Sequence, residues 1–195
     1  MYNNILTDQL FTNELVSAQF DDIDISKILG EFDSIQSDNE SKDLSNMGGY
    51  HTPTYHNESS GFSELDKLAK EAKEFLYDFL DEKDWKYYEF RSAWWGMRNV
   101  AGNYNVLHHH CKADFIALFY PKVPDNSGDF VIMRNDGIAY SPIFNRNSQC
   151  YFYLKPEVGR FYLLPGHLWH HVEASNTTDD RVCIAYNFYE MEPLP

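Results

Sequence analysis

The chain has 195 residues and a formal net charge of −14, from 30 acidic and 16 basic side chains. Its first 90 residues hold 20 of the acidic and 7 of the basic side chains. This length suits one domain with one sizeable core. The negative charge argues against binding to nucleic acid or to an anionic membrane surface.

Nothing in the sequence indicates export or membrane insertion. No run approaches the roughly 18 apolar residues that a membrane helix needs. The start MYNNILTDQL lacks the basic and apolar regions of a signal peptide. The cysteines, Cys111, Cys150 and Cys183, are odd in number and unpatterned. They favour free thiols in a reducing compartment, so we expect a cytoplasmic protein.

The first part of the chain, residues 1–84, is expected to form a layer of helices and loops outside the rest of the fold. A weak helix is predicted within residues 21–35. Residues 33–61 are rich in Ser, Asn, Asp and Gly, which predicts a long loop. The expected domain is a single one, over residues 1–195.

A strong amphipathic helix is predicted over residues 64–80. Its apolar side chains recur at helical spacing, and the stripe from Leu65 to Leu76 is expected to pack against the outside of the remaining fold. Ser63 stands where it can cap the helix, with Asp66 three residues further on.

After residue 84 the sequence changes to short β-type runs, separated by the turn signals AGN, VPDNSG, RNDG and KPEVG. About eight such strands favour an antiparallel barrel or double-sheet roll. We therefore predict a mainly β fold with N-terminal helices, a double-stranded β-helix of the jelly-roll or cupin-like type over residues 85–190. The expected strands are Tyr87–Trp95, Tyr104–His110, Phe115–Tyr120, Asp129–Met133, Tyr151–Leu154, Arg160–Leu164, His170–Glu173 and Val182–Tyr189.

Histidines gather in two stretches that lie far apart in the sequence. The first is NVLHHHC at 105–111 and the second is LPGHLWHHV at 164–172. Residues i and i+2 of a strand share a face, so His108 and His110 are expected to project together while His109 points away. Two imidazoles on one face are poor core residues but suit a metal ion, which binds neutral ring nitrogens at about 2 Å. The second stretch is expected to supply a third ligand.

Several stretches of the second half follow one another in a recognisable order. They are SAWWGMRN, GNYNVLHHHC, FIALFYP, NSGDFVI, PEVGRFYLLPGHLWHHVE and DRVCIAYNF. By their order and spacing, the segment from about Ser92 to Phe188 resembles the Fe(II)/2-oxoglutarate-dependent dioxygenases. It looks most like a small branch found in bacteria and their phages, which is similar to the prolyl hydroxylases. Earlier in the chain, SNMGGYHT is a weaker match to a loop of that branch.

The resemblance implies an iron site in which His108 and His110 fill the first two ligand positions and His170 fills the third. Such a centre binds Fe(II), takes 2-oxoglutarate and O2 as cosubstrates, and hydroxylates a primary substrate with release of succinate and CO2. His109, His167, Trp169 and His171 are candidates for contacts around the metal or with the substrate. If a phage encodes the chain, the host cytoplasm is the expected location.

The same resemblance assigns the cosubstrate-binding residues. Arg181 takes the place of the arginine that pairs with the far carboxylate of 2-oxoglutarate, a contact that suits a planar guanidinium. Tyr120 takes the place of a tyrosine that donates to the same carboxylate. Cys183 stands where the family often has serine, and Tyr104 is counted with the residues that contact the cosubstrate. If the protein binds no cosubstrate, the alternative interpretation of Arg181 is a surface arginine beside Asp179 and Asp180.

The chain departs from the family pattern at the second ligand. The commonest pattern is His-x-Asp or His-x-Glu with a distal histidine, whereas His110 makes this set all-histidine. The site then carries one more positive charge, which alters its redox poise. Asp114 carries a carboxylate, but its spacing from the histidine pair does not fit the family.

Two alternatives stay open. A cupin also has a glycine before such a pair and an acid after it, as in Gly102, His108, His110 and Asp114, but its second motif fits poorly here because Gly166 is one position early. A non-catalytic metal-binding accessory protein, for example from a phage, is the third reading. All three share the double-stranded β-helix, and the arginine discriminates because a cupin does not need it. The sequence leaves the primary substrate and the oligomeric state open. Residues 33–61 and 134–149 are candidate lids over the site.

Overall fold

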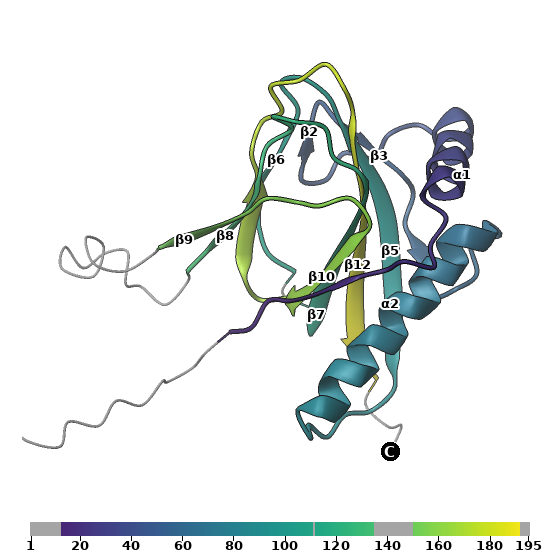
Figure 1. Cartoon of the computed structure of the whole chain (residues 1–195), viewed down its shortest axis with the longest axis vertical. Helices are drawn as coiled ribbons and strands as arrows, with labels where there is room; N and C mark the ends of the chain where they lie inside the picture. Colours follow the sequence, from purple (N-terminus) through teal and green to yellow (C-terminus); the bar gives the residue numbers. More distant parts are fainter. Residues whose placement is uncertain (1–12, 111, 135–149, 192–195) are drawn as a thin grey trace, which may run out of the picture.

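The computed structural model describes residues 13–110, 112–134 and 150–191. Two antiparallel sheets face each other, and two helices cover the outer side of one of them (Figure 1). This is the mainly β, double-stranded β-helix architecture that the sequence predicts.

The larger sheet has seven strands in the order β1-β10-β7-β12-β5-β3, and β4 also pairs with β5. The smaller sheet has five strands in the order β2-β6-β11-β8-β9. The strands of the larger sheet are β1 (Val16–Gln19), β3 (Tyr50–His51), β4 (Tyr55–His56), β5 (Phe90–Asn99), β7 (Phe115–Lys122), β10 (Arg160–Pro165) and β12 (Arg181–Glu190). Those of the smaller sheet are β2 (Asn46–Met47), β6 (Tyr104–His108), β8 (Phe130–Met133), β9 (Tyr151–Leu154) and β11 (Trp169–Val172).

All eight strands expected after residue 84 are present, with ends that differ by a few residues. The largest difference is in β5, which runs over Phe90–Asn99 instead of residues 87–95. It ends later because its last residues pair with the start of β12, Asn99 opposite Arg181.

The N-terminal part is less loop-like than expected. Helix α1 spans Ile25–Asp38, so it starts later than predicted and continues into the expected loop, and the side chain of Asp24 caps it by accepting from the Lys27 amide at 3.0 Å. The expected loop also contains β2, β3 and β4, and β1 precedes the helix. These short strands take their hydrogen bonds from the edges of the two sheets, which local composition does not reveal.

Helix α2 (Ser63–Glu82) is the predicted amphipathic helix, but its cap differs from the prediction. Ser63 is the first helical residue, and no side chain of the preceding residue caps the helix. The carboxylate of Glu31, from α1, instead accepts from the amides of Glu64 at 3.1 Å and Leu65 at 2.9 Å. Asp66 binds back to the Ser60 amide at 2.8 Å. The two helices are therefore tied together through unpaired amides of α2.

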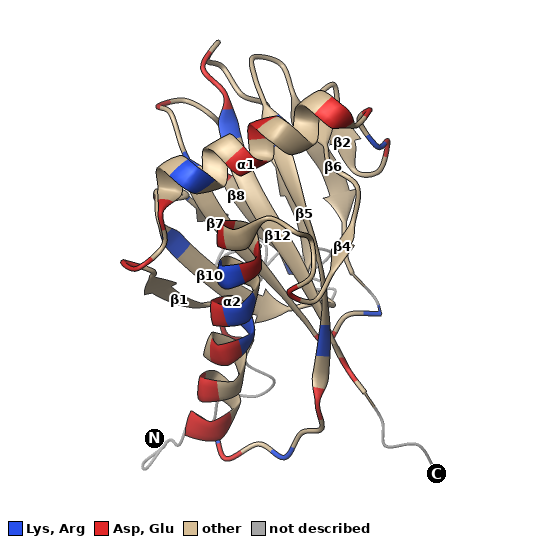
Figure 2. Cartoon of the chain, turned by 90° about the vertical axis from the view of Figure 1, so that its right-hand side faces the viewer, with Lys and Arg blue, Asp and Glu red and all other residues tan. Residues whose placement is uncertain are grey.

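Two cores hold the molecule together. One lies between the helices and the larger sheet, and the other lies between the two sheets. Gly96 of β5 lets α1 approach the larger sheet, because a Cβ at this position would lie 2.3 Å from the ring of Phe32. Figure 2 shows that acidic residues occur along both helices, on the side of the larger sheet that faces away from the smaller one. Among the described residues, no helix is long and apolar enough to cross a membrane.

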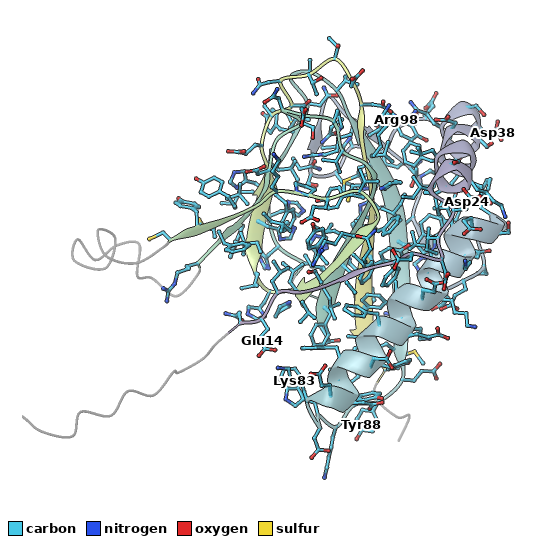
Figure 3. The ribbon with its side chains drawn as sticks, in the orientation of Figure 1. Glu14, Asp24, Asp38, Lys83, Tyr88 and Arg98 are labelled. Carbon is cyan, nitrogen blue, oxygen red and sulfur yellow. The ribbon has the colours of Figure 1, made fainter. Side chains whose placement is uncertain are left out.

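Ion pairs link separate elements of the fold. Glu14, before β1, pairs with Lys83 at the end of α2 at 2.7 Å, and Figure 3 shows the two side chains next to each other. Arg98 of β5 pairs with Asp33 of α1 and with Asp180 just before β12 at 2.8 Å. These contacts hold the helices and β5 in fixed positions around the inner core.

Candidate metal centre

A cavity of about 500 Å³ lies between the two sheets, and its walls come from both sheets and from residues of the segment 44–56. Three imidazoles converge in it, those of His108, His110 and His170. One ring nitrogen of each histidine lies within 4.8 Å of the corresponding nitrogens of the other two. The sequence predicted this convergence of residues about sixty positions apart.

Pairing of β6 with β11 brings two of the histidines together, with His170 directly opposite His108. Two residues later on β11, Val172 lies opposite Asn105. An interval of three residues on β6 therefore pairs with an interval of two on β11. This bulge turns both Asn105 and His108 toward the cavity, which strict alternation does not allow.

His110 lies just beyond the end of β6, and backbone contacts hold it there. Its amide donates to the Gly166 carbonyl at 2.9 Å, and its carbonyl accepts from the Ala113 amide at 2.9 Å. A Cβ at position 166 would lie 2.2 Å from the Ala113 carbonyl oxygen. Only glycine therefore permits the close approach of the Pro165–Gly166 turn that positions His110.

Backbone carbonyls select the ring tautomer of two of the histidines. Nδ1 of His108 lies 2.7 Å from the Val106 carbonyl oxygen, and Nδ1 of His170 lies 2.8 Å from that of Leu168. A carbonyl oxygen only accepts hydrogen bonds, so Nδ1 carries the hydrogen and the Nε2 lone pair stays free. This is the arrangement that metal-binding histidines need.

The three imidazoles are also kept uncharged. Burial and then the neighbouring histidines lower the pKa of His170 to about 3 and that of His110 to about 4. Burial also lowers the pKa of His108. A hydrogen-bonding contact with Asn187 acts in the opposite direction on His110. At neutral pH the site therefore offers neutral nitrogen ligands.

This donor set fits a divalent transition metal. Three nitrogens bound to one ion at about 2 Å in tetrahedral or facial octahedral geometry lie about 3 Å apart, so the imidazoles need to close by roughly 2 Å at most. Neutral imidazoles suit Zn, Fe, Ni and Cu. None of the described residues that line the cavity is an aspartate or a glutamate, so the described part of the site supplies no anionic ligand.

Arg181 lies at one end of the cavity and is 3% exposed. Its guanidinium donates to the carbonyls of Ser127 at 3.0 Å and Gly128 at 2.9 Å, and it reaches the side-chain oxygen of Asn99 at 3.1 Å. Asp180 turns to the other face of β12, toward Arg98 and Lys122. The alternative of a surface arginine beside acids is therefore wrong.

Two further predicted residues line the same end. Tyr120 and Cys183 share a hydrogen-bonding contact, and both lie within the electrostatic influence of Arg181. Burial raises the pKa of the Cys183 thiol to about 12 and keeps that of Tyr120 well above its ordinary value. Both groups are therefore neutral, and the Tyr120 hydroxyl is available as a donor.

Other candidates lie away from the cavity. Tyr104 is 39% exposed and does not line it, because the bulge in β6 breaks the alternation that would place Tyr104 on the face of His108. His109 packs against the ring of Trp169, with ring centroids 4.3 Å apart. His167 approaches Asn13, with 3.2 Å between Nε2 and Oδ1. None of these residues is among the cavity-lining residues, and neither is His171.

Sequence reasoning missed an aromatic stack beside the metal centre. Trp95 stacks on His110 with centroids 5.8 Å apart, and His51 also stacks on Trp95, at 5.7 Å. Trp95 shares a face of β5 with Met97 and Asn99, an alternation that the sequence contains. Nothing local signals His51, which reaches the site through the pairing of β3 with β5.

The two candidate lids differ in what the structure describes. Leu44, Ser45, Thr54 and His56, from the segment 33–61, line the cavity. Of the segment 134–149, all but Arg134 lies outside the described residues. Cys183 is a free thiol as expected, and Cys111 lies outside the described residues.

Most of the barrel matches a known family. Residues 93–187 match the family described as "Putative 2OG-Fe(II) oxygenase", where 2OG is 2-oxoglutarate. The matched span includes all three histidines and Arg181. No curated protein sequence matches the chain.

Proteins whose solved structures have the same fold include enzymes of different reaction types, such as a hydroxylase and an epimerase. A prolyl-4-hydroxylase of Pseudomonas putida is 13% identical, with a TM-score of 0.65 over 93% of this chain and 95% of its own. HygX of Streptomyces hygroscopicus, solved with nickel, 2-oxoglutarate and hygromycin B, is 13% identical, with a TM-score of 0.63 over 91% of this chain and 83% of its own. The epimerase SnoN of nogalamycin biosynthesis is 12% identical, with a TM-score of 0.66 over 90% of this chain and 77% of its own. At these identities the likeness establishes the fold.

Proposed function

We propose that the protein is a non-haem Fe(II)- and 2-oxoglutarate-dependent oxygenase that hydroxylates a primary substrate, since residues 93–187 match the 2OG-Fe(II) oxygenase family. His108, His110 and His170 hold the metal in this proposal. Arg181 and Tyr120 hold the far carboxylate of 2-oxoglutarate.

One observation carries the proposal. Arg181 is buried, its described partners are two carbonyls and an amide oxygen, and it lies at the end of a cavity whose middle holds the three imidazoles. A buried guanidinium without a counter-ion is costly, so the pocket favours an anion. A dicarboxylate that reaches both the metal and Arg181 meets this requirement.

When bound, the metal and cosubstrate would supply the oxidation. O2 and 2-oxoglutarate would be consumed, a C–H bond of the substrate would become C–OH, and succinate and CO2 would be released. The chain orients the reactants and excludes water. Tyr120, neutral because burial raises its pKa, donates to the carboxylate beside Arg181. The buried faces of Trp95, Leu118 and Phe130 form apolar walls around the histidines.

The all-histidine donor set supports a second candidate. With three neutral ligands and no described carboxylate in the cavity, the centre differs from the usual pattern of two histidines and one carboxylate. That difference favours either a cupin-type metal enzyme or a metal-binding accessory protein without turnover. Neither of these needs Arg181 to bind an anion, so the arginine separates them from the oxygenase.

Binding of N-oxalylglycine, an analogue of 2-oxoglutarate, tests the proposal. In metal-loaded protein it is expected to raise the melting temperature, since a ligand bound only to the folded state stabilises it. Arg181→Gln should remove the rise, and Arg181→Lys should weaken it because a point charge makes no bidentate contact. Anaerobic addition of Fe(II) and 2-oxoglutarate should give a weak visible charge-transfer band.

Arg160→Gln is the matched control, because Arg160 lies outside the cavity and pairs with Glu157 at 3.7 Å. It should keep the whole rise. The rise is read as a difference with and without ligand, so a change in the stability of a variant itself cancels. Metal-loaded protein that ignores millimolar 2-oxoglutarate and its analogue would contradict the oxygenase assignment and favour the cupin-type reading.

A further inference from the structure

The charge of the cavity is opposite to that of the chain. The chain carries a net charge of −14, yet the described residues lining the cavity include Arg91, Lys112 and Arg181 and no aspartate or glutamate. The acidic helices lie on the other side of the larger sheet (Figure 2). The cavity is therefore a cationic site in an acidic molecule, an arrangement that attracts anions.

Two of these cations form no ion pair with the described residues. Most other basic side chains of the described chain pair with carboxylates, as Lys27, Lys67, Arg98 and Lys122 do. Among the described residues, neither Arg91 nor Lys112 has a carboxylate within 4.0 Å. The basic residues that form ion pairs in this part of the chain are Lys27, Lys67, Lys70, Lys73, Lys83, Arg98, Lys122 and Arg160. Both side chains are exposed, and both line the cavity.

Neighbouring side chains hold Arg91 in place. Its guanidinium lies over the ring of Tyr189, 5.3 Å from the centroid. The Tyr189 hydroxyl in turn accepts from Nδ2 of Asn187 at 2.9 Å, and Asn187 contacts His110. Stacking on an aromatic face leaves the edge of a guanidinium free, so its N–H donors are presented as a planar fork. Arg91 is thus oriented for an oxyanion and linked to the metal centre.

The position of Arg91 separates it from the cosubstrate. Along β5, Arg91, Trp95 and Asn99 occupy one face at intervals of four residues, or about 13 Å each at 3.3 Å per residue. Trp95 stacks on His110, and Asn99 pairs with Arg181. Arg91 and Arg181 therefore lie on opposite sides of the histidines, and one molecule of 2-oxoglutarate bound to Arg181 does not reach Arg91.

We propose that the primary substrate carries an oxyanion, a carboxylate or a phosphate, which Arg91 binds at the end of the cavity opposite Arg181, together with Lys112 as a second cation of the cavity wall. The proposal rests on the oxygenase function proposed above. The charged group then anchors the substrate on the order of 10 Å from the metal. The uncharged part that is oxidised lies over the histidines, between the two anion sites.

Phosphorus NMR of inorganic phosphate tests the site directly. Protein loaded with Mn(II) and saturated with N-oxalylglycine has its Arg181 end occupied, so added phosphate can report only on the remaining part of the cavity. Bound phosphate should show relaxation enhancement by the paramagnetic metal, and Zn(II)-loaded protein gives the diamagnetic baseline. Carbon NMR of acetate under the same conditions is the carboxylate arm. The relaxation rate of at least one of the two probes is expected to exceed the rate measured in a sodium chloride control.

The double variant Arg91→Gln/Lys112→Gln should lose the enhancement, and Lys70→Gln/Lys86→Gln, which removes the same charge outside the cavity, should keep it. Equal enhancement in both double variants, or none in the wild type, overturns the proposal. The rise in melting temperature with N-oxalylglycine is measured on the same samples. If that rise is present and the probes stay unaffected, only the oxyanion site fails; if it is absent, the oxygenase function itself fails.

Discussion

At the scale of single residues, the metal centre depends on which way three adjacent imidazoles point. His108 and His110 face His170 across the cavity, with ring centroids 4.4 and 5.1 Å from it. His109, between them, packs on Trp169 outside the cavity. Three consecutive histidines thus have two different environments, because the backbone alternates and then turns after the end of β6.

This difference predicts the effect of alanine substitutions on metal binding. His108→Ala and His170→Ala each remove a ligand and should lower the affinity for Zn(II) or Ni(II) by more than the 10–100-fold typical of lost outer contacts. His109→Ala should leave the affinity within a few-fold of the wild type. Titration against a chromogenic chelator measures all three. Loss of binding in His109→Ala with binding retained in His108→Ala would show that the register of β6 is shifted by one residue.

At the scale of elements, the start of α2 shows how the helical layer is joined. The carboxylate of Glu31 accepts from the amides of Glu64 and Leu65 and lies 3.3 Å from the Ser63 hydroxyl. A negative charge at a helix N-terminus also interacts favourably with the helix dipole. One side chain of α1 thus replaces the cap that the sequence of α2 lacks.

We expect Glu31→Ala to lower the free energy of unfolding by about 1–2 kcal/mol, the range for loss of an N-terminal cap. Glu31→Gln keeps an acceptor and should cost less. Glu40→Ala, at an exposed position after α1, should stay within about 0.5 kcal/mol of the wild type. Urea unfolding measures each change. A loss in Glu31→Ala no larger than in Glu40→Ala would mean that the contact does not stabilise the helix pair.

The strands after residue 84 were predictable because their period of two and their turn residues are local signals. The strands β1 to β4 were not, because each has four residues or fewer and gains its hydrogen bonds from a sheet edge formed by distant residues. The histidine triad was predictable from residue type and spacing. The misplaced Tyr104 and the missed His51 depend on a bulge and on a pairing between distant strands, which a single sequence does not specify.

At the scale of the whole molecule, the N-terminal part completes the barrel. Its strands β1 and β3 lie at the two ends of the larger sheet's strand order, and β2 lies at one end of the smaller sheet's order. It also contributes His51 and Ser45 to the cavity walls. We therefore infer that the described residues before and after position 84 fold as one domain, and that unfolding of the whole molecule reports on the cavity as well.

His51 links the cavity to the global stability of the protein. It is 2% exposed, stacks on Trp95, and its Nδ1 lies 2.7 Å from the Thr52 carbonyl oxygen. Burial lowers its pKa below the ordinary value of 6.5, and the contact with Thr52 opposes this only in part. Below pH 6.5 the unfolded chain therefore binds a proton that the folded protein does not.

The sign of the pH dependence follows from this difference. The stability contributed by neutral His51 is present in full above about pH 6.5 and is lost as the pH falls toward the folded pKa, by at most about 1.4 kcal/mol per pH unit. His51→Asn keeps a donor toward the Thr52 carbonyl but removes the titrating group. We expect its free energy of unfolding, measured by urea titration from pH 7.5 downward, to fall less steeply than that of the wild type by up to this amount. His51→Gln should behave in the same way, since it lacks the same proton. Equal pH slopes of the unfolding free energy in the wild type and both variants would mean that His51 is protonated equally in the folded and unfolded states. Burial of His51 in the aromatic stack would then not lower the stability of the protein at acidic pH.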